Sequence, residues 1–536
     1  MGNPNSRSGK LGKSMSFMTF IAMVGLIFSK CSSYLREMFV ARSFSENYSD
    51  AFYNAFTIPD LVFNLLVMGA IQSAITPMLA SSISKGEEKK GLHIVSTFLT
   101  VASILMLCVS VICFIFSKQI MTIFIDPTEK PLVLDLASQA SRILYPQIFF
   151  MMLAALEIGV LNAYKRFGST SFGPTIYSIG VVISVALFAD DKPERLNLCM
   201  VGIMVAAIIY FLFQFIVGRD KLRMIRPNLD IGNPEFKALI RRAIPILFSS
   251  SIVQINLMVM RRFANKLDTG TVTCFQNAQT LWQLPYGIFA GAVGNVMLPS
   301  LSALYAAKKF KESSELLSSR IKTALFMTIP SAGFLLINSY DIIRVLFKNG
   351  KYTDTSVKRA GLILMGFCAA IVLQTVVLLF NQAFYALGKT RVPLFSGIIS
   401  LVFNPIFCMI FMKILEDPDN KLRVSMSLSL AYSLSSLIQM FFLIWLYNSN
   451  KKLAPRNLLP FIIKSGICLV MMIIVMIILN KVLPDASGYG KLYQIMFIGV
   501  KAVAAFIIYF MAACLIRMNE ALYWIRKVTS RLGVKI

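Results

Sequence analysis

The stretch LLPFIIKSGICLVMMIIVMIILNKV, residues 458–482, decides the fold class of this chain. Its charged side chains, Lys464 and Lys481, lie towards its two ends, and the residues between them are almost entirely apolar. A helix of about 20 apolar residues is long enough to cross the roughly 30 Å hydrocarbon core of a bilayer. The stretch is therefore predicted to be a membrane-spanning helix.

Comparable apolar runs recur from one end of the sequence to the other. The chain is 57% hydrophobic and only 15% charged, and its mean hydropathy is +0.69. This composition excludes an ordinary soluble globular protein and predicts an all-α, polytopic integral membrane protein of about fourteen spans. The predicted spans are 16–44, 51–81, 92–117, 134–163, 173–189, 197–218, 239–265, 272–300, 317–338, 354–387, 392–415, 422–447, 458–482 and 491–516.

The polar breaks between these spans limit the classes of function. The longest, near 219–238, is too short to hold a soluble catalytic domain, so function is expected inside the helix bundle. His93 is the only histidine, and the nine cysteines are scattered without a CxxC pair. Histidine-based catalysis, metal sites and disulfides are therefore disfavoured. We expect a transporter that is not an enzyme and that uses no metal or cofactor.

The formal net charge of +27 is distributed in a way that predicts membrane topology rather than nucleic-acid binding. Basic residues gather in alternate breaks between spans, as at 85–90, 219–226 and 451–452. Cytoplasmic loops carry such an excess of Lys and Arg. Both termini are therefore expected in the cytoplasm. The first apolar run is too long for a signal-peptide core and is expected to remain as the first span.

A weak internal repeat divides the chain into two similar halves. The spacing from Gly69 to Pro77 equals the spacing from Gly291 to Pro299, and the second pair lies about 220 residues after the first. Another pair of similar segments is separated by nearly the same number of residues. Each repeat holds six predicted spans, so both have the same orientation in the membrane. Prolines inside spans are expected to act as bend points: Pro77, Pro146, Pro285 and Pro405.

The repeat predicts a six-plus-six-plus-two architecture. Residues 1–238 are expected to form an N-lobe, 239–457 a C-lobe, 458–516 two additional helices and 517–536 a basic cytoplasmic tail. Pairs of lobes of this kind commonly bind a substrate between them and alternate access by rocking.

Short motifs occur in an order that is typical of one transporter family. Ser29-Lys30 followed by Arg36-Glu37 is similar to the family's S-R-x-x-G-x-x-R-D motif in the first span. The family's D-A-F, I-P-N-L and E-G-A-F stretches are similar, in that order, to residues 50–52, 59–61 and 69–70. Further segments match the family in the same order along the chain, at 298–302, 346–353 and 384–393. On these residues the chain resembles the MurJ (MviN) family of lipid II flippases in the MOP exporter superfamily.

The resemblance implies a function. Members of this family move lipid II, the undecaprenyl-pyrophosphate-linked peptidoglycan precursor, from the inner to the outer leaflet of the bacterial cytoplasmic membrane. Lipid II, membrane lipids and the cell-wall synthesis machinery are therefore the expected partners, and no nucleic acid is expected. The resemblance also implies that 458–516 forms a groove for the lipid tail. Sodium coupling is disfavoured, because Asn404 is followed one turn later by Cys408 rather than by a carboxylate.

The resemblance further implies that cations hold the pyrophosphate, and phosphate oxygens favour charged donors shielded from lipid. Three of the family's charged motifs are altered in this chain. The family's first-span arginine is replaced by Lys30. Its Arg-Arg-Glu set in the second span is replaced by Phe63, Asn64 and Met68, and its Asp-Arg pair in the eighth span is replaced by Gln279 and Thr280. Arg261 and Arg262 are proposed to replace the missing charge; because adjacent helix positions point about 100° apart, at most one is expected to face the cavity. The candidate substrate-binding residues are Lys30, Arg36, Glu37, Asp50, Asn64, Arg261, Arg262 and Gln279, with Glu37 and Asp50 holding the cations.

Two other functions fit the same sequence. The chain could be a flippase for another polyprenyl-linked saccharide or an exporter of the MOP type. It could also be a membrane scaffold that has kept the lobes and lost the site, since several family arginines are missing. A flippase requires a cationic cavity, an exporter favours acidic and aromatic linings, and a scaffold requires neither.

Overall fold

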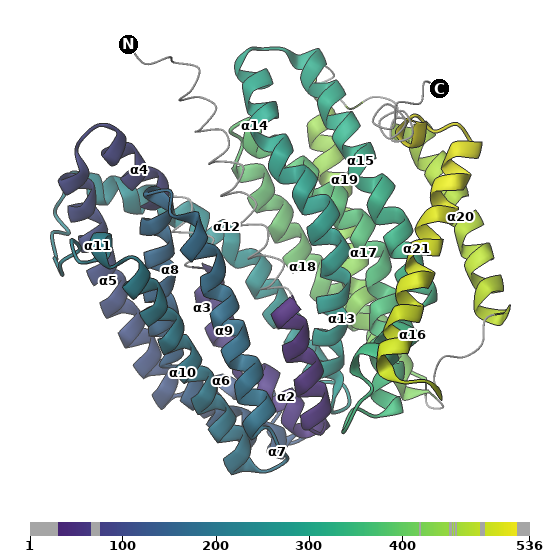
Figure 1. Cartoon of the computed structure of the whole chain (residues 1–536), viewed down its shortest axis with the longest axis horizontal. Coiled ribbons are helices and arrows are strands. Elements are labelled where there is room, and N and C mark those ends of the chain that lie inside the picture. The colour runs from purple at the N-terminus through teal and green to yellow at the C-terminus, as the bar shows by residue number, and fades with distance from the viewer. Residues whose placement is uncertain are drawn as a thin grey trace. The chain divides into compact units, whose positions relative to one another are not determined.

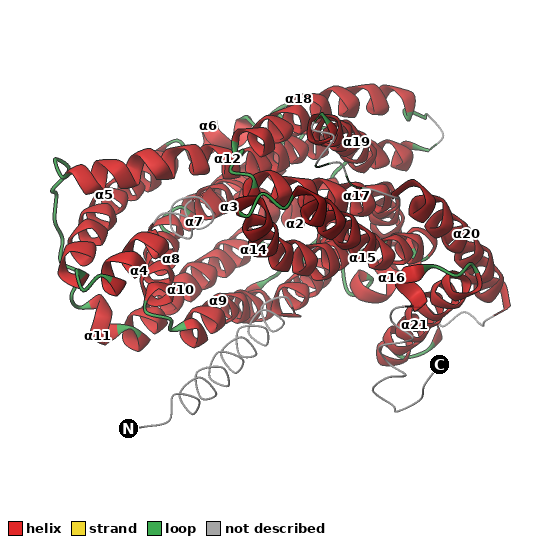
Figure 2. Ribbon diagram, turned by 90° about the horizontal axis from the view of Figure 1, so that it is seen from above, coloured by secondary structure: helices red, strands yellow, loops and turns green. Residues whose placement is uncertain are grey.

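The computed structural model describes residues 31–65, 75–417, 420–449, 453, 455, 458–482 and 488–522. The regular elements in these ranges are helices, and no strand occurs among them (Figure 2). The all-α membrane fold predicted from the apolar runs is therefore confirmed.

The chain divides into two compact units, which are described separately. Unit 1 comprises the residues up to Thr273 together with Asn349–Tyr352, and unit 2 comprises Cys274–Lys348 and the residues from Thr353 onward. The division falls after the helix that ends at Asn265, whereas the sequence places the lobe boundary at 238/239. That helix packs against helices of unit 1, which explains the later boundary.

Unit 1 begins with a helix over residues 31–43 and continues as a bundle (Figure 1). In this bundle α8 packs against α5, α9 and α10, and α12 packs against α3 and α5. Its helices are α2 (Glu46–Ala55), α3 (Thr57–Asn64), α4 (Thr76–Ser84), α5 (Glu88–Ile115), α6 (Ser117–Thr122), α7 (Pro131–Leu144), α8 (Gln147–Ala163), α9 (Phe167–Phe188), α10 (Pro193–Val217), α11 (Arg219–Leu222) and α12 (Pro234–Asn265).

Unit 2 is built around α17, which packs against α15, α16 and α19. Its helices are α13 (Thr271–Pro285), η2 (Tyr286–Gly291), α14 (Ala292–Ala306), α15 (Phe310–Ile337), α16 (Ser339–Phe347), α17 (Asp354–Ala386), α18 (Arg391–Ile414), η3 (Lys421–Ser425), α19 (Met426–Asn448), α20 (Leu458–Val482) and α21 (Lys491–Leu515). The first three residues of α13 precede the division, and the helix continues through η2 into α14.

Small side chains allow the central helices of unit 2 to approach closely. At Gly366 in α17 an added Cβ would lie 2.1 Å from Ser429 Oγ in α19, and Ser433 Oγ donates a hydrogen bond to the Gly366 carbonyl at 2.7 Å. Close approach at small and hydroxyl residues is a common way for helices to associate where lipid removes the hydrophobic driving force.

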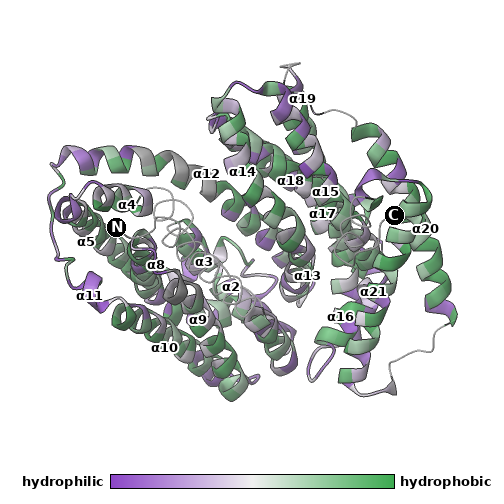
Figure 3. Ribbon diagram, turned by 45° about the horizontal axis from the view of Figure 1, so that its top comes forward, coloured by the Kyte–Doolittle hydropathy of each residue, from purple (hydrophilic) through white to green (hydrophobic). Residues whose placement is uncertain are grey.

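The lengths and surfaces of the helices fit a membrane environment. Within the described ranges, nine helices are long and apolar enough to span a bilayer, or ten if the bent pair α7–α8 is one span. The first predicted span lies largely outside the described residues, and the second is interrupted at 66–74, so the count of fourteen is not established. Large apolar side chains such as Ile467, Val470 and Ile474 are exposed on α20, which is hydrophobic along most of its length (Figure 3).

Two of the predicted prolines lie at irregularities in the helices. The bend expected at Pro146 is present, because α7 and α8 meet there at an angle of 45°. Pro285 ends the α-helical part of α13, and the next six residues form the π-helical segment η2. Both irregularities agree with the loss of a backbone donor at proline.

The segment Asn349–Tyr352 is anchored in unit 1, although the chain on both sides of it belongs to unit 2. The Lys351 amide donates to the Arg42 carbonyl at 3.1 Å, and Lys351 Nζ lies 2.9 Å from Asp190 and 3.0 Å from Asp191. Gly350 has a φ of +59°, and a Cβ there would lie 2.2 Å from the Arg42 oxygen. Only glycine fits this close approach without strain.

Candidate functional site

A buried ion pair lies in the middle of the first described helix of unit 1. Arg36 Nη2 is 2.6 Å from Glu37 Oε1, and the Glu37 side chain has no exposed surface, whereas 26% of the Arg36 side chain is exposed. Neighbouring helix positions normally point in different directions. The arginine side chain nevertheless reaches the carboxylate of its neighbour, so the buried charge of Glu37 has a cationic partner.

The second oxygen of Glu37 is bound by a tyrosine from another helix. Tyr53 in α2 donates a hydrogen bond from its hydroxyl to Glu37 Oε2, and the ring of Tyr53 packs edge-on against Phe52. Because both oxygens of Glu37 have partners, the carboxylate is fixed, and it fixes Arg36 in turn. Sequence reasoning did not find Tyr53, because α2 meets the first helix only in the folded protein.

A second guanidinium comes from the last turns of α12. Arg261 Nη1 donates to the Tyr53 carbonyl at 3.3 Å and to Thr57 Oγ1 at 3.1 Å. Its Nη2 lies 3.5 Å from Asp60 Oδ2, and the side chains of Arg261 and Asp60 are 13% and 49% exposed. Tyr53 thus contacts the Glu37 carboxylate through its hydroxyl and the Arg261 guanidinium through its backbone carbonyl.

An amide pair holds α12 at the position that brings Arg261 to this cluster. The side chains of Asn54 in α2 and Asn265 in α12 exchange two hydrogen bonds, at 3.0 and 2.9 Å. Both side chains are buried. Asn265 lies one helical turn after Arg261, so this reciprocal pair sets the register of α12 against α2.

We call Arg36, Glu37, Tyr53, Asp60 and Arg261 the guanidinium cluster. It contains two guanidinium groups and two carboxylates, so its formal charge is balanced. Arg36 Nε is buried and has no hydrogen-bond partner in the described part of the chain. A phosphate that reached the cluster would find planar donors already held in place, and it would compete with Asp60 for them.

Two predicted residues lie apart from this cluster or at its edge. Asp50 accepts hydrogen bonds from the Gly270 and Thr273 amides at 2.7 and 2.9 Å, and from Thr273 Oγ1 at 2.8 Å. It therefore caps the start of α13, as acidic side chains commonly do at helix N-termini, and it does not pair with Arg36 or Arg261. Asn64 donates to the Asp60 carbonyl at 2.8 Å, one turn back in α3.

The remaining predicted residues are placed differently. Arg262 is exposed while its neighbour Arg261 is directed towards Asp60. Gln279 is buried in α13, within unit 2. Lys30 lies outside the described residues. The sequence analysis missed Tyr53, Thr57 and Asp60 as members of the site; Asp60, which occupies the asparagine position of the I-P-N-L motif, was the one available signal.

No group of three or more His, Cys, Asp or Glu side chains suited to a metal ion occurs among the described residues. No disulfide joins the cysteines that the structure describes, and most of these side chains are buried. The guanidinium donors of the cluster, each held by a carboxylate, are suited to the recognition of an anion.

Comparison with known proteins places the chain in a family. The family model described as lipid II flippase MurJ matches residues 40–498. The probable lipid II flippase MurJ of Buchnera aphidicola subsp. Baizongia pistaciae is 24% identical over 491 residues, which cover 90% of this chain and 92% of that protein. The lipid II flippase MurJ of Burkholderia cenocepacia is 24% identical over 419 residues, covering 77% of this chain and 80% of that protein.

Two solved structures have the same fold. Lipid II flippase MurJ in an inward closed conformation matches with a TM-score of 0.76 and 22% identity, covering 93% of this chain and 99% of that structure. A multidrug resistance MATE family transporter of the MOP superfamily, in an inward-facing conformation, matches with a TM-score of 0.66 and 16% identity, covering 80% of this chain and 99% of that structure.

Proposed function

The chain belongs to the family of lipid II flippase MurJ, whose family model matches residues 40–498, and from this premise we propose that it carries lipid II from the inner to the outer leaflet of the bacterial cytoplasmic membrane. The relatives that match over most of their length bear the name of this activity. The proposal includes multi-pass insertion with both termini in the cytoplasm, as the basic loops predict.

The guanidinium cluster is the observation that supports this substrate class most strongly. A pyrophosphate carries several negative oxygens, and planar guanidinium groups bind such oxygens through two parallel N–H donors. Glu37 and Asp60 compensate the charges of Arg36 and Arg261. The pyrophosphate of the lipid would replace Asp60, the more exposed of the two carboxylates, and Glu37 would keep Arg36 in place.

We propose transport by alternating access without covalent chemistry. The two compact units and the similarly oriented repeats support this mechanism. The energetic requirement is that the buried cations are never left without a counter-charge, since an unpaired charge is costly in the membrane interior. In this proposal Glu37 and Asp60 supply the counter-charge when the lipid has left.

The test is made in bacterial cells in which the resident lipid II flippase is depleted. Expression of this chain is expected to restore growth and to prevent accumulation of lipid II in the inner leaflet, as measured by accessibility of the precursor to an external probe. Arg36→Ala is expected to lower the externally accessible fraction at least about tenfold, because one strong charge-assisted contact is lost. Arg36→Lys is expected to keep part of the activity.

Two controls make the result decisive. Membrane abundance of each variant is measured by immunoblotting, so that loss of protein is separated from loss of transport. The lipid-linked saccharides of the inner leaflet are also identified by mass spectrometry. Accumulation of a different polyprenyl-linked saccharide, with lipid II unchanged, would replace the proposed substrate, and full activity of Arg36→Ala would remove the proposed role of the guanidinium cluster.

A further inference from the structure

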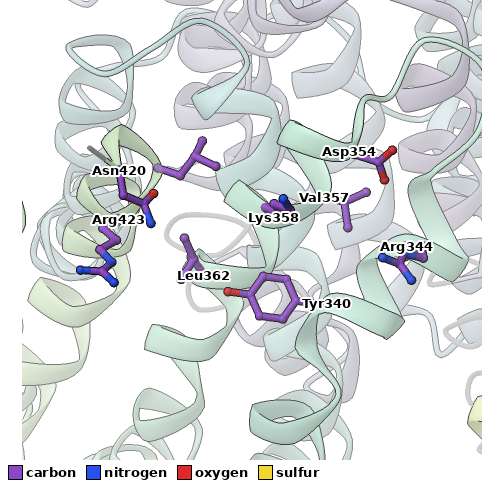
Figure 4. A pocket seen from close by; sticks show the side chains of 9 residues that line it. Tyr340, Arg344, Asp354, Val357, Lys358, Leu362, Asn420 and Arg423 are labelled. Atoms are coloured by element: carbon purple, nitrogen blue, oxygen red, sulfur yellow. The ribbon is translucent and has the colours of Figure 1, made fainter. Parts of the chain in front are cut away.

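A basic pocket lies at one end of unit 2. One chamber of about 740 Å³ is lined by Arg344, Lys348, Asp354, Lys358, Lys491 and Gln494. A second chamber of about 490 Å³ shares Arg344, Asp354 and Lys358 with the first and adds Tyr340, Asn420 and Arg423, among others. Figure 4 shows the side chains that line the second chamber, which come from α16, α17, Asn420 and η3. We call the two chambers together the α16–α17 pocket.

The charge of this pocket is not balanced by its own residues. Four cationic side chains and one carboxylate line the larger chamber. The carboxylate, Asp354, is paired with Lys348, whose Nζ is 2.7 Å from Asp354 Oδ1. Arg344 Nε is buried and lacks a hydrogen-bond partner within the described residues. The pocket therefore has a surplus of donors for an anion.

The placement of Lys491 is unfavourable for the helix that carries it. Lys491 is the first residue of α21, and a cation at a helix N-terminus is opposed by the partial positive charge of the helix dipole. Lys358 likewise lies near the start of α17. Both lysines add positive charge where two helix N-termini already supply it, so they increase the attraction of the pocket for an anion.

The predicted membrane topology places these cations on the side of the membrane where basic residues are uncommon. In the orientation predicted from the basic loops, α15 ends and α17 begins on the outer side, where loops are normally poor in Lys and Arg. Arg344 and Lys348 lie in this outer connection, and Lys358, Lys491 and Arg423 lie at the outer ends of their helices. A cluster of five cations departs from the charge pattern of the rest of the chain.

The surface beside the pocket is suited to lipid. Tyr489 and Tyr493 pack in a tilted arrangement with ring centroids 4.7 Å apart, and both rings are exposed, as in the aromatic belts that mark a membrane interface. Along α21, the side chains of Leu492, Met496 and Val500 are exposed by 74%, 63% and 65%. Acyl chains can therefore lie on α21 while a headgroup occupies the pocket.

We propose that the α16–α17 pocket binds the phosphate of an anionic phospholipid headgroup in the outer leaflet. Arg344 and Lys358 form the centre of the phosphate site because they line both chambers. Lys491 joins the phosphate site to the apolar face of α21. This inference does not depend on the transported substrate, because none of its residues belongs to the guanidinium cluster.

The experiment uses the full chain in lipid nanodiscs that contain phosphatidylglycerol and phosphatidylethanolamine, with retained lipid counted by native mass spectrometry. The double variant Arg344→Gln/Lys358→Gln is expected to retain at least about fivefold less phosphatidylglycerol than the parent chain, since each basic residue adds a favourable contact with anionic lipid. The matched control Lys309→Gln/Lys311→Gln removes two exposed cations near the other end of unit 2 and is expected to change nothing.

A second variant separates loss of charge from misfolding, and a second ligand separates lipid binding from binding of soluble phosphate. Arg344→Lys/Lys358→Arg is expected to retain phosphatidylglycerol, which separates loss of charge from misfolding. Inorganic phosphate is tested in detergent by its effect on thermal stability. Equal phosphatidylglycerol retention by the parent chain and the glutamine variant would overturn the proposal. Phosphate-dependent stabilisation that the glutamine variant loses, with lipid retention unchanged, would overturn the lipid assignment in favour of a soluble phosphate ligand.

Discussion

The guanidinium cluster of unit 1 and the α16–α17 pocket of unit 2 both present cations, but they differ in how those cations are compensated. Arg36 and Arg261 are mostly buried, and each has a carboxylate partner. The pocket holds a surplus of cations, and its paired side chains Lys348 and Asp354 are well exposed. Burial makes an unpaired charge costly, whereas water stabilises an exposed one. The cluster therefore requires counter-charges that a ligand must displace, and the pocket does not.

The largest expected difference is in protein stability. Arg36→Ala leaves Glu37 buried without its cation and is expected to lower the free energy of unfolding by about 3 kcal/mol. Arg344→Ala in the pocket is expected to change it by less than about 0.5 kcal/mol. Thermal unfolding of both variants in the same detergent measures the difference. Equal destabilisation would show that the two regions do not differ in the way described.

Neutralising Glu37 together with Arg36 tests whether the unpaired carboxylate causes the loss of stability. The double variant Arg36→Ala/Glu37→Gln no longer has an unpaired buried charge, so it is expected to recover at least half of the stability lost in Arg36→Ala. It is not expected to recover transport, because the cation that meets the phosphate is still missing. Recovery of transport together with stability would mean that Arg36 has only a structural role.

The two regions are also expected to differ, by a smaller margin, in how strongly they respond to ionic strength. Raising the ionic strength from about 0.05 M to about 0.5 M shortens the screening length severalfold. Phosphatidylglycerol retention by the α16–α17 pocket is expected to fall about threefold to fivefold over this range, while the stability difference between Arg36→Ala and the parent chain stays nearly constant. Native mass spectrometry and thermal unfolding measure the two quantities, and an equal response of both would contradict the contrast in burial.

The smallest expected effect concerns the exposed ion pairs of Lys351 with Asp190 and Asp191. The hydrogen bond from Lys351 lowers the pKa of Asp190, so the stabilisation that this pair contributes is present at neutral pH. It is lost as the pH falls through the lowered pKa of Asp190. Lys351→Gln is expected to lower the melting temperature by under about 2 °C at pH 7, and this effect is expected to shrink as the pH falls through the lowered pKa of Asp190. An effect that grew at low pH would contradict this assignment.

The sequence was sufficient to predict those features that depend only on neighbouring residues in the chain. The apolar run at 458–482 predicted α20, and Pro146 predicted the bend between α7 and α8. The angular separation of adjacent helix positions predicted that Arg261 and Arg262 would point differently. Each of these follows from the periodicity of a single helix or from the missing donor of proline.

Features that depend on contacts between helices could not be predicted in this way. Asp50 was expected beside the cations, but it caps α13, whose start lies more than 200 residues further along the chain. Tyr53 was not identified, although it contacts both Glu37 and Arg261. A side chain's position in one helix does not reveal which distant helix it will face, and the apolar sequences of these spans leave many packings open.

The most direct test of the proposed function compares two adjacent arginines in α12. Arg261 is directed into the guanidinium cluster, and Arg262 is exposed. In cells depleted of the resident lipid II flippase, the fraction of lipid II accessible from outside is measured for Arg261→Ala and Arg262→Ala at matched membrane abundance. The proposal predicts at least about a tenfold loss for Arg261→Ala and near-normal transport for Arg262→Ala. Normal transport by Arg261→Ala, or equal loss in both variants, would contradict it.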